Sequence, residues 1–176
     1  VFGDNGRITA AEANAPNFGT QPITLGLVET IESLIGGSDV ITTGLGRDIV
    51  LGGIDADTII ANFDEYRNGH GADGNNIVLG DSGYIDWTAA DASRTYDPVL
   101  SGDDINAGDI DRIFVTEPDD GGNDSIVTGD GDDIIIGGED GEIVSDVIIE
   151  GIVTQARTVS ADASDGDIIV AGNGYN

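Results

Sequence analysis

The sequence predicts an all-β fold made of many very short strands that are separated by tight turns. Apolar residues make up 39% of the 176 residues, and most of them are Ile, Val and Leu, which favour strands. They occur in short clusters such as DVITTG, DIVLGG, NNIVLGD, DIIIGG and DIIVAG, and Gly and Asp bound each cluster. Because Gly and Asp are turn formers, this pattern is typical of strands of a few residues joined by turns. A nine-residue period in two blocks of the chain supports the same fold class.

The charge of the chain limits its partners. Asp and Glu number 34 against six Arg and no Lys, so the formal net charge is -28, and there is no Cys for a disulfide or a thiolate metal ligand. We expect no nucleic-acid partner, because phosphates need cations, and no membrane insertion, because no apolar run reaches about 18 residues. High charge with few aromatics is usual for disordered chains. The apolar clusters instead favour a folded chain whose turns are neutralised by a hard cation with oxygen ligands.

The nine-residue period occupies residues 34–60, which read LIGGSDVIT, TGLGRDIVL and GGIDADTII, and residues 119–145, which read DDGGNDSIV, TGDGDDIII and GGEDGEIVS. The two blocks match at a constant offset of 85 residues. The sixth position is always acidic: Asp39, Asp48, Asp57, Asp124, Asp133 and Glu142. The eighth position is always aliphatic: Ile41, Val50, Ile59, Ile126, Ile135 and Val144. The fourth position is Gly except at Asp55 and Asp140.

This spacing suits calcium. Gly at turn positions permits a positive φ and a close approach of the backbone to an ion. Carboxylate and carbonyl oxygens at roughly 2.3–2.6 Å suit Ca²⁺, whereas Mg²⁺ needs a stricter octahedral geometry. The aliphatic eighth position is expected to point inward from each strand and to form a thin core. We therefore expect several calcium ions, and ion binding should supply much of the folding free energy.

The nonapeptide resembles G-G-x-G-x-D-x-U-x, the calcium-binding repeat of the RTX (repeats-in-toxin, haemolysin-type) proteins. Residues 43–60 and 128–145 carry the pattern best. The resemblance implies a parallel β-roll or β-solenoid, in which six residues form a calcium-binding Gly/Asp turn and three form a short strand. It also implies that the sixth-position carboxylates are ligands and that backbone carbonyls complete the shell. The first nonapeptide of each block lacks the leading Gly pair, so the terminal sites are expected to be weak or absent.

Other acidic residues lie in less regular turns and leave two readings open. Asp4 and Asp81 occupy matching GDxG turns, where an Asx turn is the alternative to calcium binding. The fourth-position acids are either additional ligands or turn formers. The complete set of candidate calcium ligands is Asp39, Asp48, Asp57, Asp124, Asp133, Glu142, Asp55, Asp140, Asp4, Asp81, Asp73, Asp165 and Asp167.

A longer repeat lies above the nonapeptides. VFGDNGRITA at the start of the chain resembles VLGDSGYIDW at residues 78–87, and GADGNNIVLGD resembles SDGDIIVAGN further on. These matches predict two related units, residues 1–77 and 78–176, in one continuous solenoid. Joining the last residues, GNGYN, to VFGDNG nearly recreates GADGNNIVLGDSG. We therefore expect the chain to be one period of a longer tandem array.

The segments between the nonapeptides are too long to be simple turns. Residues 9–22 and 87–111 are expected to be loop insertions or short side elements. Residues 24–33 and 147–160 are expected to be longer strands that pair outside the roll. A helix over residues 24–35 is the alternative for the first of these, and high β-branched content disfavours it.

The sequence offers little support for catalysis. It has no Cys nucleophile and a single His, His70, and carboxylates are so abundant that a close pair says nothing about glycoside hydrolysis. We expect a non-enzymatic, extracellular or cell-surface structural segment of a filament, surface layer or adhesin stalk, which is secreted and self-associates. Millimolar extracellular calcium suits weak sites. The alternative is an accessory calcium-binding module of a secreted enzyme or toxin.

Overall fold

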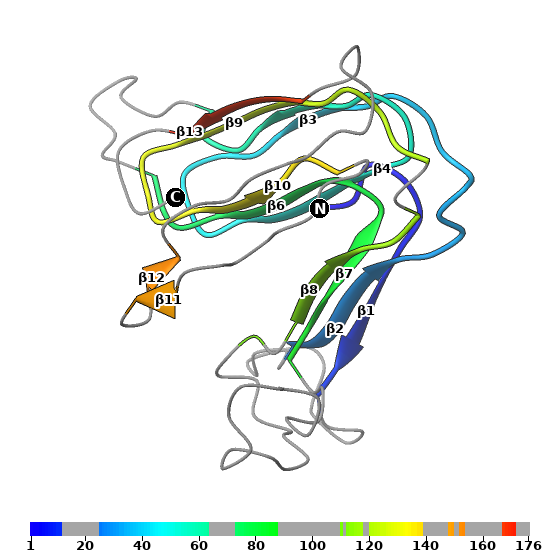
Figure 1. Ribbon diagram of the computed structural model, residues 1–176, viewed down its shortest axis with the longest axis horizontal. Coiled ribbons are helices and arrows are strands. Elements are labelled where there is room, and N and C mark those ends of the chain that lie inside the picture. The colour runs from blue at the N-terminus through cyan, green and yellow to red at the C-terminus, as the bar shows by residue number, and fades with distance from the viewer. Residues whose placement is uncertain are drawn as a thin grey trace.

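A computed structural model describes residues 1–11, 25–63, 73–87, 110, 112–117, 120–138, 148–149, 152–153 and 167–171. These residues form strands and turns only, which confirms the all-β prediction (Figure 1). None of them belongs to a helix that is long and apolar enough to cross a membrane.

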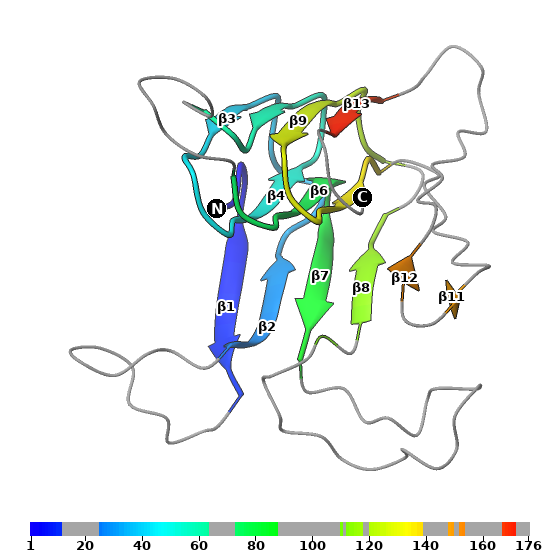
Figure 2. The same ribbon diagram turned by 90° about the vertical axis from the view of Figure 1, so that its left-hand side faces the viewer.

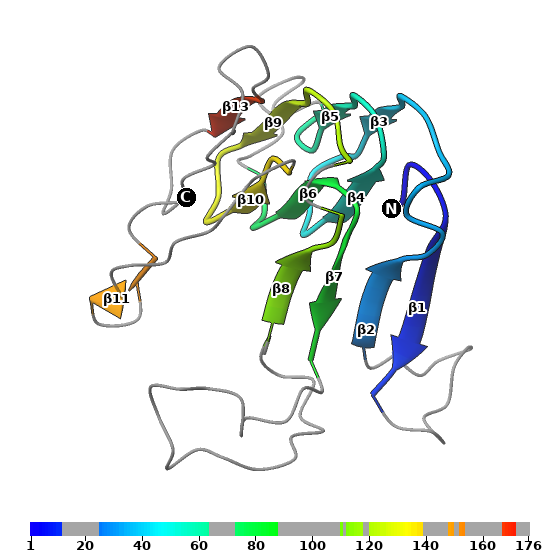
Figure 3. The ribbon, with the colours of Figure 1, turned by 45° about the vertical axis from the view of Figure 1, so that its right-hand side comes forward.

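Two parallel sheets contain the nonapeptide strands. One has the order β13-β9-β5-β3 and the other the order β10-β6-β4. Along the chain, consecutive strands alternate between these two sheets, so that each strand pairs with one from a neighbouring turn of the chain (Figures 1 and 3). The strands are β3 (Val40–Thr42), β4 (Ile49–Gly53), β5 (Thr58–Ile60), β6 (Ile77–Asp81), β9 (Ser125–Gly129), β10 (Ile134–Ile136) and β13 (Ile168–Ala171).

A four-stranded antiparallel sheet projects from this pair of sheets and departs from a purely parallel arrangement (Figure 2). Its strands, in the order β1-β2-β7-β8, are β1 (Gly6–Ala10), β2 (Leu25–Thr30), β7 (Gly83–Asp86) and β8 (Arg112–Val115). Strand β2 confirms the expected strand within residues 24–33, and the helix alternative is wrong over the described residues 25–35. Within residues 147–160, the described residues form one short antiparallel pair, β11 (Ile148–Ile149) with β12 (Ile152–Val153).

The pairing register of the antiparallel sheet repeats along the chain. Ile8 pairs with Val28 in β1-β2, and Ile85 pairs with Ile113 in β7-β8. The two members of the pair are thus displaced by 77 and 85 residues, the offsets found in the sequence. The match between residues 71–81 and 164–173 does not extend to the structure, because β6 and β13 lie in different sheets. Strand β13 takes the place next to β9, whereas β6 lies between β4 and β10.

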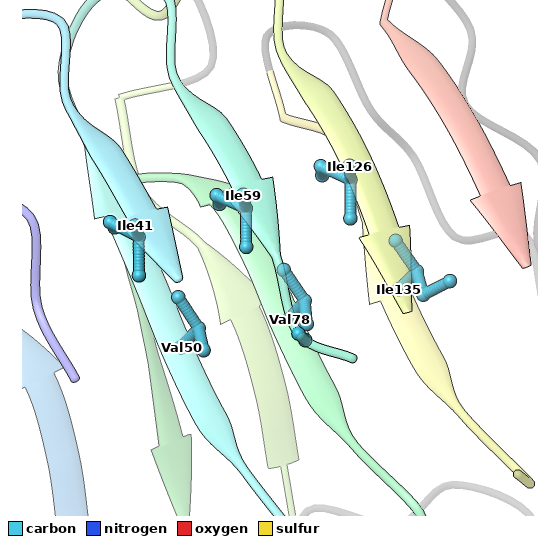
Figure 4. Packing of buried hydrophobic residues seen from close by; sticks show 7 residues of the cluster. Ile41, Val50, Ile59, Val78, Ile126 and Ile135 are labelled. Atoms are coloured by element: carbon cyan, nitrogen blue, oxygen red, sulfur yellow. The ribbon is translucent and has the colours of Figure 1, made fainter. Parts of the chain in front are cut away.

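The thin core between the two parallel sheets has the predicted composition. Every described eighth-position side chain is buried there, together with Ala61 and with Val78 from β6 (Figure 4). A second cluster, formed by Val28, Leu51, Leu79, Ile85, Trp87 and Ile136, lies where the antiparallel sheet meets β4, β6 and β10.

Loss of a core side chain should destabilise the fold strongly. Ile59 is fully buried, and its replacement by Ala is expected to lower the free energy of unfolding by about 2–5 kcal/mol. Ile35→Ala is the matched control, because Ile35 is 63% exposed. Urea unfolding of both variants in saturating calcium measures the difference, and equal losses would contradict the assignment of this core.

Candidate metal sites

The sixth-position acids of the first parallel sheet form one hydrogen-bonded row. Asp57 accepts the backbone N–H of Asp39 on Oδ1 at 2.7 Å. Asp124 accepts that of Asp57 at 2.7 Å, and Asp167 accepts that of Asp124 at 3.0 Å. Each residue directly precedes a strand of the sheet β13-β9-β5-β3. The structure thus brings together four predicted ligands, Asp39, Asp57, Asp124 and Asp167, which we call the first row.

A second row precedes the strands of the other parallel sheet and includes a residue that the sequence analysis missed. Asn76 Oδ1 accepts the N–H of Asp48 at 3.0 Å, and Asp133 Oδ1 accepts the N–H of Asn76 at 2.8 Å. Residues 71–79, GADGNNIVL, fit the nonapeptide with Gly74 fourth, Asn76 sixth and Val78 eighth. This signal was present in the sequence, but a requirement for an acid at the sixth position hid it.

In the first row, the second carboxylate oxygens of Asp57 and Asp124 are buried without a hydrogen-bond partner. Both residues are only 2% exposed. A buried polar atom of this kind is costly unless something pairs with it. Since each Oδ1 already accepts a backbone N–H, the Oδ2 atoms are the positions at which a partner is missing.

Backbone carbonyl oxygens lie against these same Oδ2 atoms. A Cβ at Gly52 would collide with Oδ2 of Asp57 and with the carbonyl oxygen of Gly80. A Cβ at Gly80 would collide with Oδ2 of Asp124 and with the carbonyl oxygen of Gly137. Each glycine therefore lies beside a small space that is lined by a carboxylate oxygen and a carbonyl oxygen, and a side chain would fill it.

The electrostatics of the first row disfavour its carboxylates in the absence of a cation. Burial raises the pKa of Asp124 to about 8, and the charges of Asp81, Asp167 and Asp57 add to this effect. Burial likewise raises the pKa of Asp57 to about 6, and burial raises the pKa of Asp167. In the second row, burial raises the pKa of Asp133. A positive charge beside these groups would reverse the shifts.

Asp4 and Asp81 bind backbone N–H groups of distant turns. Asp4 accepts the N–H of Gly37 on Oδ1 at 3.2 Å and that of Ile54 on Oδ2 at 3.0 Å. Asp81 is fully buried and accepts the N–H of Gly122 at 3.1 Å. These bonds differ from a local Asx turn, because they join the GDxG turns to turns that lie 33 to 50 residues away. Both carboxylates hold the antiparallel sheet's connections against the parallel sheets.

The remaining predicted ligands have less regular places. Asp73 accepts the backbone N–H groups of Gly46 and Gly74, each at 2.8 Å, and so supports the second row. Asp55 is exposed and has φ of 70°, a left-handed conformation that agrees with the turn-former reading. Glu142, Asp140 and Asp165 lie outside the described residues.

Within the described ranges, no three Asp, Glu or His side chains converge as metal ligands. An ion in either row would therefore need backbone carbonyls for most of its coordination. No protein-family model, no curated protein and no solved structure matches this chain.

Proposed function

We propose that this chain is a calcium-stabilised, non-enzymatic structural segment of an extracellular filament, surface layer or adhesin stalk. The observation that carries the proposal is the pair of buried Oδ2 atoms of Asp57 and Asp124, which lack partners and lie against glycine carbonyls. Oxygen atoms without donors, in flexible turns, are the coordination environment that Ca²⁺ accepts.

The parallel β-roll is the architecture that accounts for these observations together. Strands alternate between two parallel sheets, the eighth position fills the core, and the sixth position forms a row at the turns. In this architecture an ion in the first row would lie between adjacent turns and bind Asp57 and Asp124 through Oδ2. The carbonyls of Gly52, Gly80 and Gly137 supply further oxygens. The second row, with Asp48, Asn76 and Asp133, would provide a similar set with one charge fewer.

A structural role follows from what the ions would do. The core is thin, and a chain with net charge -28 repels itself. Binding of calcium in the folded state alone would couple folding to the calcium concentration. Millimolar extracellular calcium would keep such a segment folded after secretion, whereas low calcium would leave it unfolded.

Removal of one charge from the first row should weaken calcium binding. Asp124→Asn keeps the shape of the side chain and can still accept the N–H of Asp57, but it withdraws the anionic Oδ2. We expect the calcium midpoint for folding, followed by circular dichroism, to rise at least tenfold. Asp120→Asn is the control, because Asp120 is an exposed acid outside both rows.

The calcium titration decides between the two outcomes. Equal midpoints for Asp124→Asn, Asp120→Asn and the unaltered chain would overturn the assignment of the first row as a calcium site. Magnesium at the same concentrations should fold the chain poorly, because Mg²⁺ demands stricter geometry.

A further inference from the structure

We propose that a second copy of this chain stacks end to end on the first, with its β1 paired to β8. The inference deepens the proposed structural role, because it names the partner and the register of self-association. It rests on that role in one respect: two copies of an acidic chain are brought together here as parts of an array.

All three large sheets follow one another in the same direction. Strands β1, β4 and β3 lie at one end of their sheets, and β8, β10 and β13 lie at the other (Figure 2). Among the described strands, the outer sides of β1 and β8 have no partner strand. Open edges of this kind are templates for pairing with another chain. Each end of the molecule therefore offers edges that match the opposite end.

The junction between β2 and β7 defines how two copies would meet. In it, Val28 pairs with Ile85 and Glu29 pairs with Tyr84, in antiparallel register. Strand β8 is the counterpart of β2, and β1 is the counterpart of β7, by the displacements of 85 and 77 residues. The same junction formed between copies places Ile113 opposite Ile8 of the second copy. It also places Phe114 opposite Arg7 of the second copy.

One cross-strand line of side chains would be completed by this junction. Ile8, Val28, Ile85 and Ile113 succeed one another across the four strands. The inner two are buried, at 4% and 0% exposure, whereas Ile8 at the edge is 56% exposed. Ile113 from a second copy would cover Ile8 and give it the environment that Val28 and Ile85 already have.

The neighbouring line of side chains is also complementary. It consists of Arg7, which forms an ion pair with Glu29 at 2.7 Å, followed by Tyr84 and Phe114. Tyr84 stacks on Phe114 with ring centroids 5.6 Å apart, and Phe114 is 57% exposed. Arg7 of a second copy would lie beside this exposed ring, where a guanidinium gains a cation–π interaction.

Cysteine cross-linking tests this register, because the chain itself contains no Cys. Trp87 donates its N–H to Gly26, so the Glu29–Tyr84 pair, two steps beyond the bonded pair, is a non-hydrogen-bonded one. Such pairs have Cα atoms about 4.5 Å apart, a separation that a disulfide spans. Arg7→Cys and Phe114→Cys are made in separate chains, mixed in calcium and oxidised. Within one chain the two positions are three strand spacings apart, about 14 Å, and cannot be bridged.

The expected product is a disulfide-linked heterodimer of Arg7→Cys with Phe114→Cys, and little product from either variant alone. Asn5→Cys mixed with Phe114→Cys is the off-register control and should cross-link at least fivefold less. Equal amounts of homodimer would indicate symmetric edge pairing and overturn the proposal, as would the absence of cross-links. Circular dichroism of the same samples separates the two proposals. Calcium-dependent folding without the heterodimer would refute stacking alone, and a heterodimer with no effect of calcium on folding would refute the calcium role alone.

Discussion

Removal of calcium at pH 7.5 is expected to unfold most of the protein, and acidification of the calcium-free protein to about pH 5 is expected to restore part of its β structure. The first effect follows from the unpartnered, buried carboxylate oxygens of Asp57 and Asp124. With no cation beside them, these charges oppose folding, and the thin core has little surplus stability to offset them.

The pH effect follows from the raised pKa values. In the folded state the pKa of Asp57 is about 6 and that of Asp124 about 8, both above the model value of 3.8. Between these limits the folded state binds more protons than the unfolded state, so the stability of the calcium-free protein falls as pH rises from about 4 to about 8. Calcium acts in the opposite direction, because it binds the deprotonated carboxylates and should bind more tightly as pH rises.

Circular dichroism in excess EGTA, from pH 5 to pH 8, measures the first trend, and calcium titrations at the same pH values measure the second. General charge repulsion is a weak alternative explanation, since ordinary Asp and Glu residues are already ionised at pH 5.5. Asp124→Asn is the control, because it removes the group with the highest of these pKa values and should flatten the upper part of the pH profile. A spectrum that is unchanged by EGTA at pH 7.5 would contradict the calcium-dependent fold.

Local sequence patterns predicted the all-β class and the core, since alternation within a three-residue strand decides which side chain points inward. Ile41, Val50 and Ile59 show this directly. The place of Asn76 could also have been derived, because Gly74 and Val78 flank it in the nonapeptide register.

The antiparallel sheet could not have been predicted in the same way. Its pairs join residues about 20 to 30 positions apart, such as Arg7 with Glu29 and Tyr84 with Phe114. Neither strand has a strong alternation that names its partner, and the partner is chosen by tertiary contacts. The long-range hydrogen bonds of Asp4 and Asp81 are of the same kind, because a carboxylate in a GDxG turn carries no local mark of which distant N–H it will meet.

Gly80→Ala is expected to be the most damaging single substitution in the first row. Gly80 is buried, and the added methyl group would meet Oδ2 of Asp124 and the carbonyl oxygen of Gly137. Both atoms belong to packed backbone or to a hydrogen-bonded carboxylate, so neither can move without breaking the row. Overpacking of this kind costs about 1–3 kcal/mol, and the methyl group would also occupy the space in which an ion is proposed to bind. The stability of the calcium-bound protein and its calcium affinity should therefore fall together.

Gly44→Ala is the matched control, because a Cβ at Gly44 would meet nothing within 4 Å. It should leave stability unchanged or raise it by about 0.4–1 kcal/mol, since Ala restricts the unfolded chain. Urea unfolding with and without calcium compares the two variants. If Gly80→Ala costs the same with and without calcium, the space beside Asp124 serves packing alone. If its cost is larger in calcium, the lost binding energy is added to the steric term, and a calcium ion bound beside Gly80 is the simplest source of that difference.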